Sequence, residues 1–240
     1  MIPLWKLRRE WASLKQQLQA VPERLIGPAR QRRLDARFPA DCRVQDGDRG
    51  LGDRVAIFLV FQPAGLSESC RQTCEHLARH GYAVLLVANH ALRDMDVQGL
   101  RPVVWRFVQR PNFGYDFGGY RDGLTCLAQW GVKPDELLIL NDSVWLPMQP
   151  TTDLLERLSA HPADIAGTIL RTRRSEQFLE SYLYRLNRRA LTHPGFTAFW
   201  SALRLTSNKY HVIRRGERGF SAAMQAAGLR LAGISKNASP

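Results

Sequence analysis

Cysteine, long apolar runs and targeting segments are scarce in this chain of 240 residues. Its four cysteines, Cys42, Cys70, Cys74 and Cys126, include no CxxC pair and no repeated spacing, which argues against a disulfide scaffold and against a zinc site. No apolar run is long enough to cross a bilayer, and charges follow the first residues where a signal peptide would have its apolar segment. We therefore expect a protein of the reducing cytoplasm.

Motifs of several enzyme classes are missing as well. The chain has no P-loop and no Gly-x-Ser-x-Gly turn, which disfavours a kinase or a hydrolase. Gly114, Gly118 and Gly119 do not give the dinucleotide fingerprint. His76 and His80 are four residues apart but lack the glutamate of a zinc-protease motif, so a surface helix explains them better.

Acidic residues are the minority among the charged ones. The chain has 34 Lys and Arg against 22 Asp and Glu, a formal charge of +12. Such a balance favours an anionic partner, which is nucleic acid, an anionic membrane surface or a phosphorylated small molecule. Without zinc-finger spacing, an RNP-type strand or a basic zipper, nucleic-acid binding ranks last of the three, and no nucleic-acid partner is expected.

The first residues carry a helical pattern. Apolar residues recur every three or four positions, at Leu4, Leu7, Trp11, Leu14, Leu18, Val21 and Leu25. With basic residues between them, they predict an amphipathic helix that lies on an anionic membrane, or one that packs on its own domain or on a second copy. Residues 28–53 mix arginine with Pro, Gly and Asp and are interpreted as a basic linker. The chain then divides into residues 1–53 and a domain at 54–240.

Strand and helix patterns alternate through the first half of that domain. Apolar runs at residues 55–61, 83–88, 103–108 and 137–140 are typical of buried strands. Helical patterns lie between them, one capped by Ser67 or Ser69 and ending near Gly81, another over residues 120–130. Because parallel neighbours need crossover connections, we expect an α/β fold with a mainly parallel, Rossmann-like sheet flanked by helices.

The second half gives weaker signals. Helices are expected over residues 151–158 and 220–227, with a short strand over 164–169. Arginines surround the aromatic segment 178–184. That region fits a surface for phosphate or sugar rings, and it fits equally helices with arginine-rich solvated faces.

Two polar loops follow the third and fourth apolar runs. The first contains Asn112, Gly114, Asp116, Gly118 and Gly119, and the second is Asn141-Asp-Ser143. In open α/β sheets ligands bind outside the carboxyl ends of the strands, so these loops predict a small-molecule site. Glycine lets the backbone approach a ligand, and a carboxylate holds a hydroxyl or a metal ion. Asp142 in a turn or capping role is the alternative.

Four groups of motifs occur in a fixed order. They are Asn112-Phe-Gly-Tyr-Asp116 with Gly118-Gly-Tyr120, Leu140-Asn-Asp-Ser-Val-Trp145 with Pro147, Glu180-Ser-Tyr182 with Phe199-Trp200, and Val212-Ile213 with Glu217. In this order and spacing, over residues 54–233, the chain resembles the rhamnan synthesis F family of bacterial polysaccharide glycosyltransferases.

The resemblance implies an A-type glycosyltransferase fold that binds a nucleotide sugar at the carboxyl edge of the sheet. By it, Gln62 and Asn89 border the base and ribose, while Asn112, Gly114, Asp116 and Gly119 lie near the nucleotide and donor sugar. Asn141, Asp142 and Ser143 occupy the place of an Asp-x-Asp motif, where Asp142 would ligate Mg²⁺ or Mn²⁺. Since the tripeptide has one carboxylate, nearby basic residues are the alternative for neutralising the diphosphate.

The resemblance also implies a catalytic base. An inverting transfer needs a carboxylate to take the proton of the acceptor hydroxyl. Glu217 sits like the acidic residue that opens a late helix in inverting A-type enzymes, although acids favour a first helical turn in any case. Glu180 is the second candidate, and the family counterpart of its segment tends to be Gln-Ser-Tyr.

These inferences give one function and two alternatives. The favoured function is a hexosyltransferase, a rhamnosyltransferase by the resemblance, that moves a sugar from a nucleotide donor such as dTDP-rhamnose to a polysaccharide or lipid-linked acceptor. It would work in the cytoplasm at the inner face of the membrane. The alternatives are a non-catalytic subunit with the same fold that binds a partner enzyme or glycan, and, third, a nucleic-acid-binding module.

Overall fold

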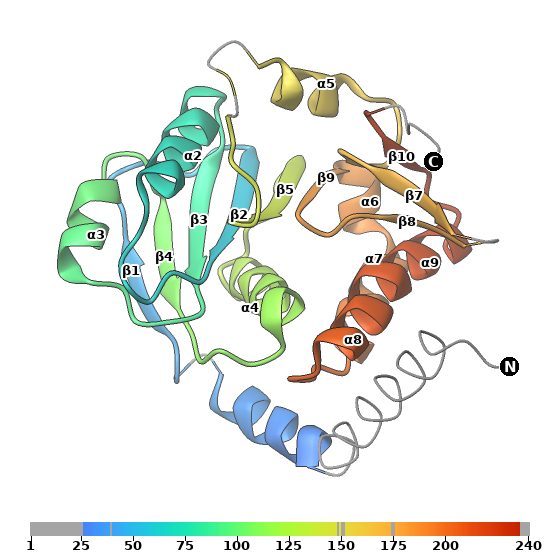
Figure 1. Ribbon diagram of the computed structural model, residues 1–240, viewed down its shortest axis with the longest axis horizontal. Helices are drawn as coiled ribbons and strands as arrows, with labels where there is room; N and C mark the ends of the chain where they lie inside the picture. Colours follow the sequence, from blue (N-terminus) through green and yellow to red (C-terminus); the bar gives the residue numbers. More distant parts are fainter. Residues whose placement is uncertain (1–25, 39, 148, 150–151, 174–175, 236–240) are drawn as a thin grey trace, which may run out of the picture.

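The computed structural model describes residues 26–38, 40–147, 149, 152–173 and 176–235, arranged as Figure 1 shows. The amphipathic helix expected over residues 4–25 lies outside these described residues. In the described part of the chain, none of the helices has the length and apolar character needed to span a bilayer.

One large sheet organises the molecule, with the strand order β1-β4-β3-β2-β5-β9-β6-β10. Its strands are β1 Arg43–Asp46, β2 Arg54–Val60, β3 Ala83–Ala88, β4 Arg106–Gln109, β5 Glu136–Asn141, β6 Ile165–Gly167, β9 Leu183–Asn187 and β10 Leu231–Gly233. Strands β4, β3, β2 and β5 are parallel neighbours, while β1 and β9 pair antiparallel with theirs. Strands β7 Leu170–Arg173 and β8 Glu176–Leu179 pair as a second sheet. The expected mainly parallel α/β sheet is confirmed.

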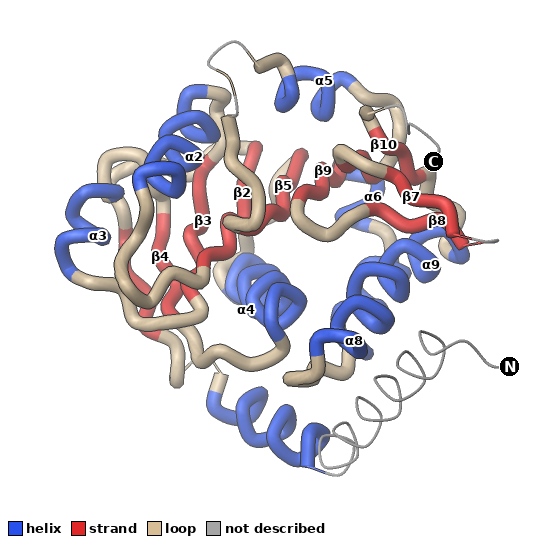
Figure 2. The backbone as a smooth tube through the Cα atoms, viewed as in Figure 1, coloured by secondary structure: helices blue, strands red, loops and turns tan. Residues whose placement is uncertain are grey.

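Helices cover both faces of the large sheet (Figures 1 and 2). They are α2 Glu68–Arg79, α3 Asp94–Leu100, α4 Tyr115–Gln129, α5 Leu154–Ala160, α6 Arg188–Thr192, α7 Pro194–Ala202, α8 Lys209–Val212 and α9 Gly219–Ala226, with a π-helix η1 Ile213–Arg218 between the last two. Alternate residues of β2 enter different cores: Val55 and Ile57 pack with α4, α7 and α9, whereas Ala56 and Phe58 pack with α2 and α5. A strand buried on both faces therefore needs the continuous apolar run seen in the sequence.

Helix α2 follows the predicted boundaries closely. The Ser67 side chain caps it by accepting the Cys70 N–H at 3.3 Å. Gly81, two residues past Arg79, has a φ of +80°, a backbone conformation that favours glycine at a helix end. The Ser67 cap and Gly81 thus define where α2, the helix that connects β2 to β3, begins and ends.

The segment interpreted as a linker is structured, so that interpretation is wrong for its described residues. Residues 26–37 are helical, and the Gln31 side chain holds this helix to the domain by donating to Leu203 O at 3.0 Å and accepting the Leu205 N–H at 2.9 Å. Strand β1 pairs antiparallel with β4 at the edge of the sheet. Local Pro and Gly content did not reveal these contacts, because their partners lie far along the chain.

The aromatic stretch 178–184 also differs from the expectation of solvated helices. It forms the end of β8 and the start of β9, and β9 inserts antiparallel between β5 and β6. Leu183, Tyr184 and Leu186 are at most 2% exposed, so burial and not solvation explains their apolar character.

Candidate functional site

The carboxyl ends of β2, β3, β4 and β5 meet at one edge of the sheet, because these four strands are parallel. The residues that follow them are Phe61 and Gln62, Asn89 and His90, Arg110, and Asp142. Backbone hydrogen bonds join these ends: Asn89 N donates to Val60 O at 3.0 Å, and Asp142 N donates to Leu59 O at 3.1 Å. The loops that carry the predicted donor residues are therefore neighbours.

Asp142 is fixed by the loop after β2. Its Oδ2 accepts the Phe61 N–H at 3.1 Å and the Gln62 side-chain amide at 3.0 Å. Gln62 in turn accepts the Ser67 N–H at 2.7 Å, which connects this contact to the capped start of α2. The structure thus brings together Gln62 and Asp142, two of the residues predicted for the donor site.

Asp116 lies one residue into α4 and faces the end of β5. Its Oδ2 accepts from Asn141 Nδ2 at 3.0 Å. Burial raises the pKa of the Asp116 carboxyl above its ordinary value; the Asn141 hydrogen bond and Lys209 oppose that rise, whereas Asp142 and Glu217 add to it. Asp142 directly follows Asn141, whose side chain binds Asp116, and Asn141 N also donates to Tyr182 O, next to the Ser181 N–H that binds Glu217. Asp116, Asp142 and Glu217, hereafter the carboxylate cluster, therefore lie in one region of the edge.

Glu217 reaches this region from η1, in the middle of a continuous helical run from α8 to α9. The expectation that Glu217 opens a helix is therefore wrong: the run begins at Lys209, where the Asn208 side chain caps it by accepting the His211 N–H at 3.2 Å. Stabilisation of a first helical turn does not explain Glu217. Single π-helical turns inside α-helices occur frequently at functional sites.

Ser181 links Glu217 to the sheet. Its N–H donates to Glu217 Oε2 at 2.9 Å, and its carbonyl accepts the Tyr120 hydroxyl at 2.9 Å. Because β9 is antiparallel to β5, the turn before β9 lies at the carboxyl end of β5, and Tyr182 O accepts the Asn141 N–H at 3.2 Å. The motif Glu180-Ser-Tyr182 thereby orients the proposed base.

Glu180, the second candidate base, has a different environment. Its carboxylate forms an ion pair and hydrogen bond with Arg171 of β7, and its side chain is 18% exposed. The Arg171 guanidinium thus occupies the Glu180 carboxylate, whereas Glu217 is bound by the Ser181 N–H at the end of β5. The geometry therefore favours Glu217 over Glu180.

Two glycines of the first loop serve packing, which differs from the predicted close approach to a ligand. A Cβ at Gly119 would lie 2.3 Å from Leu59 Cδ1, so Gly119 lets α4 pack directly on β2. Gly114 has a φ of +83° and packs against Leu205. Asn112 and Ser143 are exposed at the edge, and the Ser143 N–H donates to Asn141 Oδ1 at 3.0 Å.

Arg110 is a residue of this edge that the sequence motifs did not reveal. It is buried and donates to Asn89 Oδ1 at 2.6 Å, to Asp122 Oδ2 at 2.6 Å and to Phe113 O at 2.8 Å. Arg110 therefore locks the loops after β3 and β4 to α4 and sets the orientation of Asn89. Its position directly after a predicted strand and ahead of a polar loop was the available signal.

His90 is a second member of the edge that the motifs did not reveal. Its ring meets Phe61 edge-on, with centroids 5.9 Å apart. Burial lowers the pKa of His90, against smaller opposing effects of Asp142 and Asp96, so the imidazole is neutral at pH 7. Phe61 and His90 together form an aromatic pair beside Asp142.

A metal ion would have few protein ligands at this edge. Among the described residues, no group of three or more His, Cys, Asp or Glu side chains is placed to share one ion. A divalent cation that relies on one or two carboxylates and on substrate phosphates is compatible with Asp142. Such an ion would need the diphosphate to complete its shell.

A cavity of about 770 Å³ lies elsewhere in the molecule. Its lining comes from the second half of α4, from α6 and α7, and from the helix at 26–37, with Leu127, Phe196 and Trp200 among the apolar members. None of the predicted site residues lines it. We therefore assign the site to the carboxyl edge of the sheet because of the polar side chains there, and not because of the size of a cavity.

Comparisons with known proteins identify the family of this chain. The mainly parallel sheet, with helices on both faces and polar loops at the strand ends, defines the chain as an α/β protein. The sequence profile of rhamnan synthesis protein F matches residues 84–238, and the chain belongs to this family.

An uncharacterised protein of Sinorhizobium fredii is 32% identical over 220 residues, which are 90% of this chain and 57% of that protein. The chain thus spans a little over half the length of this relative. Two solved structures align with the chain at low similarity. A mannosyltransferase from Pyrobaculum calidifontis in complex with GDP-Man and Mn²⁺ aligns over 92% of this chain and 65% of its own, with 12% identity and a TM-score of 0.45. The glycosyltransferase GlyE from Streptococcus pneumoniae aligns over 76% and 45%, with 14% identity and a TM-score of 0.40.

Proposed function

We propose that this chain is a glycosyltransferase that moves a hexose from a nucleotide-sugar donor to a hydroxyl of a growing polysaccharide or lipid-linked glycan. The observation that carries the proposal is the carboxylate cluster, three acids from three separate segments that hydrogen bonds hold at the carboxyl edge of a parallel sheet. Membership of the rhamnan synthesis F family supports the same function. It also supports rhamnose as the sugar and dTDP-rhamnose as the donor.

The donor would lie across the ends of β2, β3 and β5. In this arrangement Gln62 and Asn89 border the nucleotide, and Asp116 contacts the sugar, with Asn141 holding the carboxylate in place. A divalent cation that bridges the diphosphate would take Asp142 as its protein ligand and supply positive charge for the leaving group. Lys209, which is exposed near Asp116, adds a further positive charge at this edge.

Glu217 would act as the base of an inverting transfer. Its carboxylate takes the proton of the acceptor hydroxyl as that oxygen forms a bond to the anomeric carbon, and the bond from that carbon to the diphosphate oxygen breaks. The nucleoside diphosphate then departs with the bonding electron pair. The Ser181 N–H, on Glu217 Oε2, orients the carboxylate for this step.

Calorimetry and turnover assays together test the proposal. Wild-type protein is titrated with dTDP-rhamnose, UDP-glucose and GDP-mannose, with and without Mn²⁺, and we expect selective binding that Asp142→Asn weakens. Glu217→Gln keeps an oxygen for the Ser181 N–H, so it should retain donor binding while turnover falls by about 10²- to 10⁴-fold, the usual contribution of a general base. Glu180→Gln is the matched control and should retain turnover.

Each outcome bears on a separate part of the proposal. Normal turnover of Glu217→Gln, together with loss in Glu180→Gln, would reverse the assignment of the base. Absence of binding to all three donors would refute the transferase function. An association with the inner face of the membrane is part of the proposal and predicts sedimentation with anionic vesicles that weakens as salt is raised.

A further inference from the structure

Exposed large apolar side chains of the described residues separate into aromatic and aliphatic groups with different locations. The aromatic ones are Phe61 (51% exposed), Tyr115 (43%), Trp145 (72%) and Tyr210 (58%). The aliphatic ones are Ile26, Val44, Leu51, Met95 and Ile213. Every member of the aromatic group belongs to a loop or helix that also carries the site, whereas most of the aliphatic ones do not.

The chain positions and contacts establish this proximity. Phe61 donates its N–H to Asp142, and Tyr115 directly precedes Asp116. Trp145 follows Asp142 by three residues. Tyr210 is next to Lys209, whose charge lowers the pKa of Asp116, and its helix α8 packs on α4. The exposed aromatic residues therefore lie on the segments that carry the carboxylate cluster.

These rings are held outward by ordered backbone. Leu146, next to Trp145, is 4% exposed, and its carbonyl accepts the Thr73 hydroxyl at 2.7 Å, so the loop is anchored while the indole stays in solvent. Tyr115 has a φ of +49°, an uncommon conformation for a residue with a side chain. Side chains kept exposed by an anchored loop and by a strained backbone are typical of sites that bind a partner.

We propose that Tyr115, Trp145 and Tyr210 form an aromatic rim that binds pyranose rings of the glycan acceptor. The inference rests on the proposed function, since it names the acceptor side of the same site. A pyranose has an apolar C–H face that packs on an aromatic ring and hydroxyls at its edge that donate to carboxylates, so rings beside acids match both. Phe61 is assigned to the donor side of the site, because its N–H donates to Asp142.

A lipid surface is the other chemistry that exposed Trp and Tyr side chains suit. Anionic headgroups attract basic residues, whereas the rim residues lie on segments that carry Asp116, Asp142 and Glu217. Repulsion between these carboxylates and the headgroups disfavours a membrane at the rim. For the acceptor, these acids therefore favour a neutral polyhydroxylated ligand, whose hydroxyls can donate to them.

Saturation-transfer NMR measures the rim without turnover. With an α-linked rhamnose trisaccharide and maltotriose as probes, saturation of the protein aromatic protons should pass to the sugar C–H protons. Trp145→Ala and Tyr210→Ala should weaken binding by about fivefold or more, the usual effect of truncating an aromatic anchor. Trp145→Phe and Tyr210→Phe keep an aromatic ring and should retain most of the binding affinity for the sugar. Met95→Ala, at a side chain that is 68% exposed on α3, is the matched control and should change nothing.

The outcomes separate this inference from the proposed function. Donor calorimetry on the same variants should stay within twofold of wild type, which excludes misfolding. Failure of the wild type to bind donor, with saturation transfer intact, refutes the transferase but leaves the rim. Donor binding without any sugar signal in the wild type, or equal signals in Trp145→Ala and wild type, overturns the rim. A blue shift of tryptophan emission on phosphatidylglycerol vesicles that Trp145→Ala abolishes would assign the ring to a membrane and also overturn it.

Discussion

At the scale of single residues, Asp116 is an acid whose burial opposes its charge. The pKa of Asp116 is raised, chiefly by burial and further by Asp142 and Glu217. An acid with a higher pKa in the folded than in the unfolded state contributes stability below its unfolded pKa and loses it as pH rises through its folded pKa. At pH 7 the ionised carboxylate therefore costs folding free energy. Such a cost is typical of residues kept for function.

Asp116→Asn should consequently be more stable than wild type at neutral pH while it binds donor less well. The asparagine oxygen still accepts from Asn141, so the variant loses the buried charge and keeps the hydrogen bond. We expect a higher free energy of unfolding than wild type at pH 7 in urea unfolding, because the variant has no charge to desolvate. The gain should shrink as the pH falls through the raised pKa of Asp116 in the folded state and should nearly vanish below about 4, the ordinary range of an aspartate, where Asp116 is protonated in both states.

An exposed aspartate provides the comparison for that measurement. Asp53 lies in solvent before β2, and Asp53→Asn should leave stability unchanged at both pH values. If Asp116→Asn proved less stable than wild type at pH 7, the carboxylate would be held by attraction and not strained by burial.

At the scale of elements, the contact between η1 and α4 determines where Glu217 lies. Gly216 makes this contact, and a Cβ there would lie 2.4 Å from Phe117 Cδ2 in α4. Phe117 is itself buried and stacks on Trp200, so it has little freedom to move aside. A glycine is therefore required for η1 to approach the helix that carries Asp116.

Gly216→Ala should destabilise the fold and also impair catalysis. Overpacking of this kind costs about 1–3 kcal/mol, and a displacement of Glu217 by about 1 Å is enough to lower turnover by about a hundredfold. Gly99→Ala in α3 is the control, because nothing lies within 4 Å of the place that an added methyl group would occupy and alanine favours helix. Normal turnover in Gly216→Ala would mean that η1 tolerates the shift and that the base lies elsewhere.

The elements differ in how far their sequences predict them. Strands β2, β3 and β5 are continuous apolar runs, and parallel geometry alone brings Asp116 and Asp142 to one edge. The start of the last helical run was missed because Gly216 and Gly219 interrupt its pattern, and tertiary packing on Phe117 overrides that local preference. Strand β9 was missed because Arg185, in its centre, is accommodated by distant partners, Glu136 49 residues away and the carbonyls of Ser159, His161 and Ala163.

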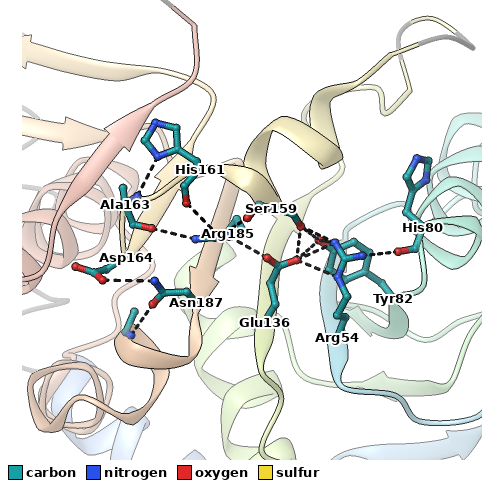
Figure 3. A network of polar contacts seen from close by, with 11 residues as sticks. Arg54, His80, Tyr82, Glu136, Ser159, His161, Ala163, Asp164, Arg185 and Asn187 are labelled. Atoms are coloured by element: carbon teal, nitrogen blue, oxygen red, sulfur yellow. Dashed lines mark hydrogen bonds and ion pairs between the residues drawn. The ribbon is translucent and has the colours of Figure 1, made fainter.

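At the scale of the whole molecule, that acid joins the two halves of the sheet. Glu136 begins β5 and forms ion pairs with Arg54 of β2 at 2.9 Å and with Arg185 of β9 at 3.0 Å, as Figure 3 shows. Tyr82 and Ser159 donate to the same carboxylate, at 2.5 and 2.6 Å. The network thus connects the parallel strands to the antiparallel β9 at the end of the sheet opposite the carboxylate cluster.

Glu136 should therefore govern global stability and its dependence on acid. Burial alone would raise the pKa of Glu136, but hydrogen bonds from Ser159, Tyr82 and Arg54 lower it below its ordinary value. For an acid with a lowered folded pKa, the stabilisation is present above the unfolded pKa and is lost as pH falls through the folded pKa. Wild type should accordingly lose stability on acidification below about pH 4, the ordinary range of a glutamate.

Glu136→Gln should remove most of this stabilisation at pH 7. Breaking a buried ion pair from one side costs about 3–5 kcal/mol, because the remaining charge, here the 6%-exposed side chain of Arg185, loses its partner. Glu156→Gln breaks the exposed pair with His80 and should cost less than about 1 kcal/mol. In urea unfolding, the stability deficit of Glu136→Gln should be smaller at pH 3 than at pH 7. A deficit equal at both pH values would mean that the Glu136 side chain stabilises the fold through its packing and not through its charge. An unchanged donor affinity of the folded variant would show that the network stabilises the sheet without affecting the donor site.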